Sequence, residues 1–99
     1  PYLQHVKAQL DNNMTVPASI PSSARKNLRA RVRVLINDTG YLLKWEWQPG
    51  GASDNAAFDL MIADTFKGFG IGGQRKFKQP PPEHLNKWIK VTVDGGQLR

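Results

Sequence analysis

The feature that most constrains the fold is a strict alternation of side chains over residues 28–48, interrupted once by a turn. In residues 28–36 every second position is apolar, and arginine occupies three of the positions between. The segment Asn37-Asp38-Thr39-Gly40 supplies turn chemistry, with Gly40 able to take a positive φ. The returning residues place Tyr41, Leu43, Trp45 and Trp47 on one face and Leu42, Lys44, Glu46 and Gln48 on the other. A period of two around a tight turn predicts an antiparallel hairpin with one apolar and one basic face.

A helical pattern follows over residues 54–67. Its apolar stripe consists of Phe58, Met61, Ile62 and Phe66, widened by Leu60 and Ala63. Ser53 or Asp54 is the expected N-cap, and Gly68 is the expected residue just beyond the C-terminus. The helix can cover the apolar face of the hairpin.

Residues 1–13 form a second helical pattern, in which Tyr2, Leu3, Val6 and Leu10 recur at helical spacing. His5 lies on the polar side of this pattern and is expected to be solvated. Residues 14–21 contain two prolines and no period, which predicts a connector that leads to a short helical turn at Ser22-Ser23.

The last strand is predicted over residues 87–93, followed by a frayed tail after Asp94. Ile89, Val91 and Val93 face the core, and Trp88, Lys90 and Thr92 face outward. The element order is helix, strand, strand, helix, strand. With a crossover of the usual hand, the third strand returns beside the first. The chain is thus expected to be a single α+β domain over 1–99, with two helices packed on one face of a three-stranded antiparallel or mixed sheet of order 2-1-3.

Composition excludes several classes of site. The chain has no cysteine, so disulfides and thiolate metal sites are absent. His5 and His84 are far apart in the sequence and each in polar surroundings, and no nucleophile is paired with a base. Of the carboxylates Asp54, Asp59 and Asp64, only Asp59 lies beside the apolar stripe. We therefore expect no catalytic site, no metal and no cofactor. The chain begins at Pro1 rather than Met, so it is expected to be a fragment or a processed product.

The glycine-rich segment 68–78 is basic and precedes the proline cluster QPPP. A phosphate-binding loop needs a strand before its glycines and a helix after them, whereas here a helix comes first and prolines follow. The segment is instead expected to be a flexible basic loop that flanks a ligand site.

Taken together, several motifs of the chain resemble the C-terminal domain of the TonB/TolA family of cell-envelope energy transducers. The motifs are VRVLIND with its turn at Gly40, the PGGASDNAAFD segment anchored by Phe58-Asp59, the QPPP cluster and the closing IKVTV. The opening helix YLQHVKAQL is more similar to TolA. The chain departs from TonB domains at Ile20-Pro21-Ser22, which stands where a Tyr-Pro lead-in is usual, and in the longer basic insertion GFGIGGQRKFK.

The resemblance implies a periplasmic domain whose inner-membrane anchor, and whose contacts with inner-membrane motor proteins, lie outside this chain. Such domains bind an extended peptide of an outer-membrane receptor or envelope partner by adding a strand to their own last strand. Transferred to this sequence, the contact involves Trp88, Ile89, Lys90, Val91, Thr92 and Val93. Related short fragments exchange strands, so a homodimer is compatible with this family.

Two alternatives remain open. A nucleic-acid-binding domain would use Arg29, Arg31, Arg33, Lys44 and Lys90 as a positive sheet face, with Trp88 stacking on a base. The presence of Glu46 on that face, and the inward direction of Trp45 and Trp47, favour a peptide partner over nucleic acid. The other alternative is an envelope adaptor with a structural or motility role that uses the same fold.

Overall fold

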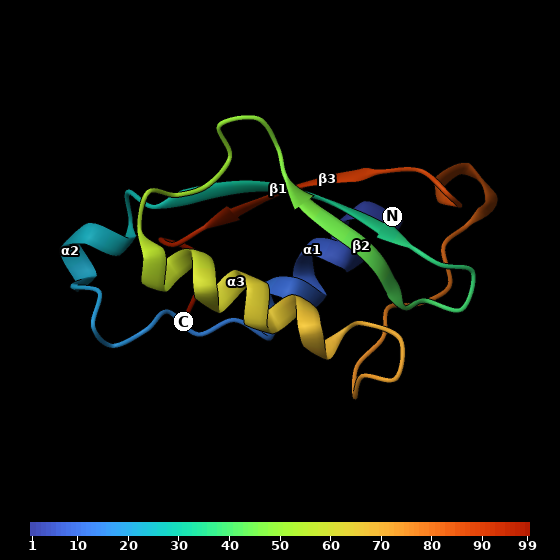
Figure 1. Ribbon diagram of the computed structural model, residues 1–99, viewed down its shortest axis with the longest axis horizontal. Helices are drawn as coiled ribbons and strands as arrows, with labels where there is room; N and C mark the ends of the chain where they lie inside the picture. The colour runs from blue at the N-terminus through green and yellow to red at the C-terminus, as the bar shows by residue number, and fades with distance from the viewer.

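The computed structural model describes all of residues 1–99 as a small α+β fold (Figure 1). The helices are α1 (Tyr2–Asn12), α2 (Ser22–Arg25) and α3 (Ala56–Gly68), and a 3-10 helix η1 (Pro82–His84) follows the proline cluster. The strands are β1 (Arg29–Ile36), β2 (Leu42–Trp47) and β3 (Ile89–Asp94). The predicted order of the main elements is confirmed, and η1 was not predicted.

The three strands form one sheet in the order β2-β1-β3, with both neighbouring pairs antiparallel. The predicted order is therefore correct, with β1 in the middle and β3 at an edge. Val32 on the central strand lies opposite Trp47 on one side and Val91 on the other. The alternation of β1 is also as predicted, because Ala30, Val32, Val34 and Ile36 are all buried.

The predicted alternation of β2 is wrong at its start. Leu42 is buried and Leu43 is 45% exposed, the reverse of the expectation. The register shifts here, so that Ile36 pairs with Leu42 but Leu35 pairs with Lys44. Leu43 is thus the extra residue of a β-bulge, and an extra residue reverses the faces of its neighbours.

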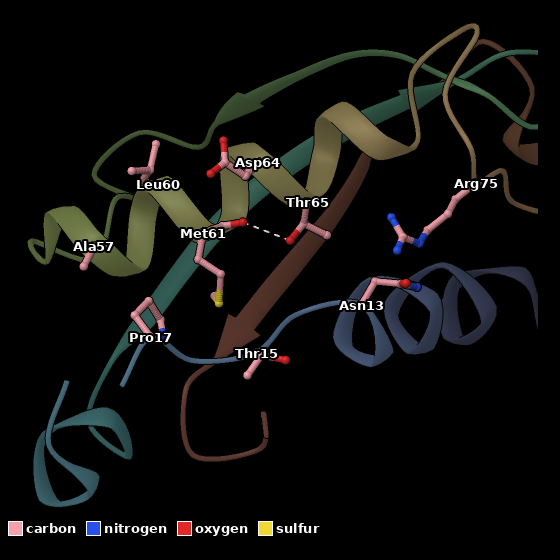
Figure 2. A pocket seen from close by; sticks show the side chains of 9 residues that line it. All are labelled: Asn13, Thr15, Pro17, Ala57, Leu60, Met61, Asp64, Thr65 and Arg75. Atoms are coloured by element: carbon pink, nitrogen blue, oxygen red, sulfur yellow. Dashed lines mark hydrogen bonds between the residues drawn. The ribbon is translucent and has the colours of Figure 1, made fainter. Parts of the chain in front are cut away.

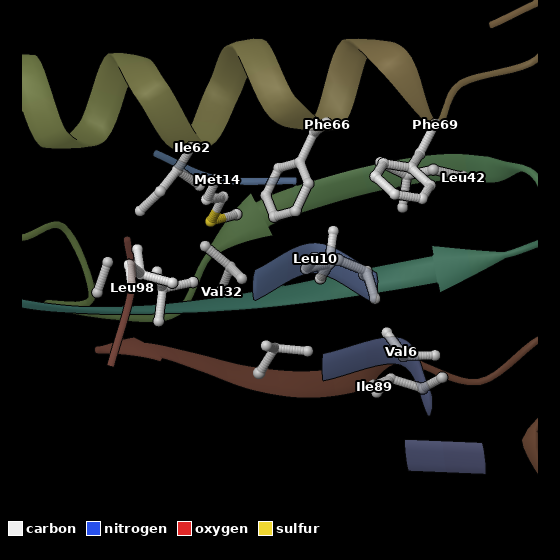
Figure 3. Packing of buried hydrophobic residues seen from close by; sticks show 14 of the residues in the cluster. Val6, Leu10, Met14, Val32, Leu42, Ile62, Phe66, Phe69, Ile89 and Leu98 are labelled. Carbon is white, nitrogen blue, oxygen red and sulfur yellow. The ribbon is translucent and has the colours of Figure 1, made fainter. Parts of the chain in front are cut away.

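One hydrophobic core holds the elements together (Figure 3). The cluster joins the buried residues of the sheet to Val6 and Leu10 from α1 and to Phe58, Ile62 and Phe66 from α3. Trp45 and Trp47 pack edge to face at 5.1 Å between ring centroids, and Trp45 lies 4.8 Å from Phe66. The two tryptophans of β2 are therefore part of the core boundary.

The connector and the C-terminal tail also enter this core, which the sequence did not predict. Met14, Val16 and Ile20 are buried, and so is Leu98. The backbone N–H of Val16 donates to the Arg99 carbonyl (2.9 Å), and the Arg25 guanidinium donates to the Leu98 carbonyl (3.0 Å). The C-terminal tail, expected to be frayed, instead packs against the core and is hydrogen-bonded to the connector and to α2.

Both ends of α3 differ from the prediction. The N-cap is Asn55, whose side chain accepts from the N–H of Phe58 (3.0 Å). Ser53 has another role, because its hydroxyl donates to Asp59 Oδ1 (2.6 Å). At the other end Gly68 is helical and the C-cap is Phe69, with φ −98°.

Leu60, expected to widen the apolar stripe of α3, is 61% exposed. The buried face of the helix is limited to Phe58, Ile62 and Phe66, with Met61 half-buried.

Two buried phenylalanines bracket the glycine segment. Phe69 and Phe77 stack with ring centroids 4.4 Å apart, and between them Gly73 donates to the Gly70 carbonyl (2.8 Å). The segment is tied to the hairpin as well, since Leu42 donates to the Phe69 carbonyl and Phe77 donates to the Gly40 carbonyl (both 2.8 Å). Buried phenylalanines thus fix both ends of the basic segment to the core.

Candidate strand-addition edge

The free edge of β3 is defined by which of its backbone groups point away from β1. Gly95 donates to the Leu28 carbonyl (2.9 Å), one step beyond the Arg29–Asp94 pair in the same register. Hydrogen-bonded pairs alternate along an antiparallel ladder. Ile89, Val91 and Val93 therefore bond to β1, and the backbone groups of Lys90, Thr92 and Asp94 point outward.

The hydrogen bonds of β1 on its β2 side give the same assignment of outward groups on β3. Arg31 donates to the Gly51 carbonyl (2.8 Å) and accepts from Gln48 (2.9 Å), so the odd-numbered residues of β1 face β2. Its even-numbered residues then face β3, opposite Ile89, Val91 and Val93. The two observations are independent and agree.

Most of the outward groups on β3 are unpaired. Outside the ladders, no backbone hydrogen bond comes from the N–H of Lys90, Thr92 or Asp94. The Asp94 carbonyl accepts from Gln97 (3.0 Å) in the turn that ends the strand. The usable stretch of the edge therefore runs from Lys90 to the N–H of Asp94.

Helix α1 lines one side of a groove beside this edge. This groove, of about 280 Å³, lies between Leu3, Gln4 and Lys7 of α1 and Lys90, Val91 and Thr92 of β3. The Lys7 ammonium donates to Asp11 Oδ2 and to the outward carbonyl of Thr92, each at 3.0 Å. Sequence reasoning missed the three α1 residues, because only the folded chain brings this side of α1 next to β3, and Leu3, expected in the apolar stripe, is 47% exposed.

Five of the six residues predicted to bind a partner belong to β3, and Trp88 precedes it. Trp88 is 37% exposed, and the Arg33 guanidinium lies over its ring at 4.4 Å from the centroid. Trp88 therefore packs on the open face of the sheet and flanks the edge at its beginning.

Three of the five basic side chains assigned to the open face are already engaged. Arg29 pairs with Asp94 (3.3 Å), Arg31 donates to the Pro49 carbonyl (3.0 Å), and Arg33 pairs with Glu46. Lys44 and Lys90 take part in none of the four ion pairs of the structure. The face is basic, but its arginines form internal contacts.

The second edge of the sheet, on β2, is also partly free. Because Lys44 and Glu46 bond to β1, the backbone groups of Trp45 and Trp47 point outward. The beginning of this edge is covered, since Leu42 bridges to Gly70 of the glycine segment. The available stretch is shorter than that on β3.

The two histidines, far apart in the sequence, both lie beside the ring of Tyr2. The Tyr2 ring lies 5.8 Å from the His5 ring and 6.0 Å from the His84 ring. His5 is half-buried and accepts at Nε2 from the N–H of Lys78 (3.0 Å), so it is not a solvated surface residue. Burial and the nearby Lys78 charge lower the pKa of His5, and burial raises the pKa of Tyr2 to about 12.

A larger groove, of about 560 Å³, lies between α3 and the connector (Figure 2). Leu60 and Met61 line it from α3, Thr15 and Pro17 from the connector, and Arg75 from the basic segment. Arg75 and Asp64 bring opposite charges to the same opening. This groove shares no residue with the β3 edge.

No helix of the structure is both long and apolar enough to span a bilayer, and no three His, Asp or Glu side chains gather around one point as metal ligands would. Comparison of the chain with protein-family models, curated proteins and solved structures finds no match in any of them.

Proposed function

We propose that this chain is a protein-interaction domain that binds an extended peptide by adding a strand to β3, in the manner of the TonB/TolA-like envelope energy transducers. The observation that supports it is the row of outward N–H groups at Lys90, Thr92 and Asp94, which have no hydrogen-bond partner on this edge. Main-chain hydrogen bonds to such a row give affinity and direction, and alternate side chains give selectivity.

In this proposal the domain lies in the periplasm, and its partner is a segment of an outer-membrane receptor or another envelope protein. Its anchor and its contacts with motor proteins lie outside the chain. The domain is not an enzyme and uses no cofactor. A structural or motility adaptor would use the same edge, and the identity of the bound peptide distinguishes the two roles.

Nucleic-acid binding is the competing function. It would use the open face, where Lys44 and Lys90 have no ion-pair partner. Binding there would have to displace Arg33 from Glu46 and Trp88, and Arg29 from Asp94. These internal contacts favour the peptide.

The test is a pair of substitutions at the centre of the edge. Because the N–H of Thr92 points outward, Thr92→Pro removes a donor that the added strand needs without removing a bond to β1, and proline is tolerated at such edge positions. Thr92→Val keeps the donor and the β-branched shape. Chemical shifts of the labelled domain are recorded during titration with envelope-protein peptides at two salt concentrations.

The expected result is peptide binding to the wild type and to Thr92→Val, with shifts concentrated at Trp88 to Val93, little salt dependence, and loss of binding in Thr92→Pro. The amide spectrum of each free variant reports whether it is folded. Equal binding by both variants, each folded, would contradict the proposal. So would an oligonucleotide response at Arg29 to Arg33 that salt removes.

A further inference from the structure

Two lysines and no acidic residue line the groove beside β3, and the carboxylate of Asp11 is bound to one of them, Lys7. Lys7 and Lys90 line it from opposite sides, together with Leu3, Gln4, Val91 and Thr92. Lys90 has no ion pair, and its cross-strand neighbour is Arg33, another cation. A strand that enters this groove meets the Lys7–Asp11 pair on the α1 side and no acidic residue in the lining itself.

Lys7 also blocks the edge that a partner needs. Its ammonium donates to the Thr92 carbonyl, which is the central outward acceptor of β3. An added strand would present one of its own N–H groups to that oxygen. In the free domain Lys7 thus occupies one of the carbonyl acceptors to which the added strand would bond.

An ammonium carries three N–H donors, and Lys7 uses two of them, on Asp11 and on Thr92. The Lys7 side chain is 41% exposed, so it can reorient toward a ligand while it stays paired with Asp11. A carboxylate of the partner is a stronger acceptor than a carbonyl. It would draw Lys7 from Thr92 and leave the carbonyl free for the added strand.

Helix α1 runs in the same direction as β3, which fixes the order of side chains that the partner meets. Tyr2 donates to the Lys78 carbonyl and stacks on His84, both before β3, whereas Lys7 reaches Thr92 near its end. Leu3, which is 47% exposed, precedes Lys7 by one helical turn. The four-residue step from Leu3 to Lys7 rises about 6 Å, close to the roughly 6.8 Å between alternate residues of a strand.

We infer that the strand accepted by β3 is acidic, with a carboxylate that takes Lys7 from the Thr92 carbonyl and an apolar residue two positions away that covers Leu3. Lys7 is then a specificity residue, which keeps the edge closed to uncharged strands and opens it to acidic ones. This inference rests on the proposed strand addition and specifies the chemistry of the partner.

The experiment compares two blocked eight-residue peptides of alternating valine and threonine. One has a single glutamate in the middle and the other has glutamine there. Because a peptide of this length can shift its register along β3, one charged residue suffices to reach Lys7. Each peptide is titrated into the wild type, Lys7→Met and the control Lys67→Met, which removes an 80%-exposed lysine on α3.

In the wild type and in Lys67→Met, the glutamate peptide should bind about fivefold more tightly than the glutamine peptide, as for a partly exposed charge pair. In Lys7→Met the glutamine peptide should bind more tightly than it does to the wild type, because the Thr92 carbonyl is free. The preference for glutamate should shrink in the same variant. An affinity gain for one peptide together with a lost preference is not the signature of general unfolding.

The outcomes separate the inference from the function on which it rests. If both peptides bind β3 equally in the wild type and in Lys7→Met, the role of Lys7 is refuted and strand addition stands. An equal loss of both peptides in a folded Lys7→Met variant also refutes that role. If neither these peptides nor the envelope-protein peptides perturb the β3 amides in any variant, strand addition itself fails.

Discussion

At the scale of single residues, α1 binds both backbone polar groups of Lys78. Its N–H donates to His5 Nε2 (3.0 Å), and its carbonyl accepts from the Tyr2 hydroxyl (2.8 Å). Both bonds require particular protonation states, a neutral His5 and a protonated Tyr2. The pKa of about 12 keeps Tyr2 protonated throughout the neutral range. His5 is therefore the member of the pair that makes the contact sensitive to pH.

We expect the free energy of unfolding to decrease as the pH falls below about 6.5, the ordinary pKa of histidine in an unfolded chain. Burial and the Lys78 charge lower the pKa of His5 in the fold, so the unfolded chain binds the proton more readily. The contribution of His5 is complete above pH 6.5 and is lost as the pH passes through the lowered pKa. Urea unfolding at pH 7.5 and pH 5.5 measures the change.

The matched variants are His5→Gln, which keeps an acceptor that does not titrate, and His84→Gln, which removes the neighbouring imidazole. The difference in the free energy of unfolding between pH 7.5 and pH 5.5 should shrink in His5→Gln and persist in His84→Gln. The same pH dependence in His5→Gln as in the wild type would show that another group is responsible.

Two glycines with positive φ distinguish a crowded turn from an open one. Gly40 has φ +99°, and a Cβ there would overlap the Phe77 carbonyl oxygen, whereas Gly72 has φ +82° and open space around it. Gly72→Ala should cost only the backbone term of about 1–2 kcal/mol. Gly40→Ala should cost at least about 2 kcal/mol more, because the Phe77–Gly40 hydrogen bond must also shift. Denaturant unfolding of both variants checks this, and equal costs would refute the close contact.

At the scale of elements, the two sides of α3 differ strongly in burial. Phe66 is 1% exposed and packs on Trp45, whereas Leu60 on the same helix is 61% exposed. Phe66→Ala should lower the free energy of unfolding by about 3–5 kcal/mol, and Leu60→Ala by less than about 0.5 kcal/mol. Thermal or urea unfolding of the two variants provides the measurement. Similar losses in both would mean that α3 is rotated from the orientation described.

The elements with a clear period could be predicted from the sequence, and those without one could not. The hairpin, α3 and β3 each repeat apolar residues at the spacing of a strand or a helix, and the sheet order followed from their succession. The bulge at Leu43 left no mark, because either of two adjacent leucines can be the buried one. Met14, Val16, Ile20 and Leu98 were missed for a related reason, since isolated apolar residues beside prolines or glycines form no pattern.

The candidate site was predicted in part. The sequence indicated β3 as an edge strand with alternating faces, because its period and its place after α3 are visible in the chain. The groove was not visible, because Lys7 and Thr92 are 85 positions apart and meet only through the packing of α1. The sequence did not predict the ion pair between Lys7 and Asp11 either, because Asp11 lies among the polar residues where the helical pattern of α1 ends.

At the scale of the whole molecule, three surfaces are candidates for binding the proposed partner. They are the β3 edge, the shorter free edge at Trp45 and Trp47, and the basic open face. The net charge of +6 attracts an acidic partner to all three and so does not choose among them. Unpaired backbone groups beside a groove distinguish the β3 edge, and the arginines of the open face are engaged internally.

Amide hydrogen exchange of the domain, free and saturated with a bound peptide, tests strand addition to β3 most directly. The account predicts slower exchange at Lys90, Thr92 and Asp94, whose N–H groups point outward. Ile89, Val91 and Val93 should change little, because their N–H groups already bond to β1. This alternation is specific to pairing along the β3 edge. New protection at Trp45 and Trp47, or slowing spread evenly over β3, would contradict the account.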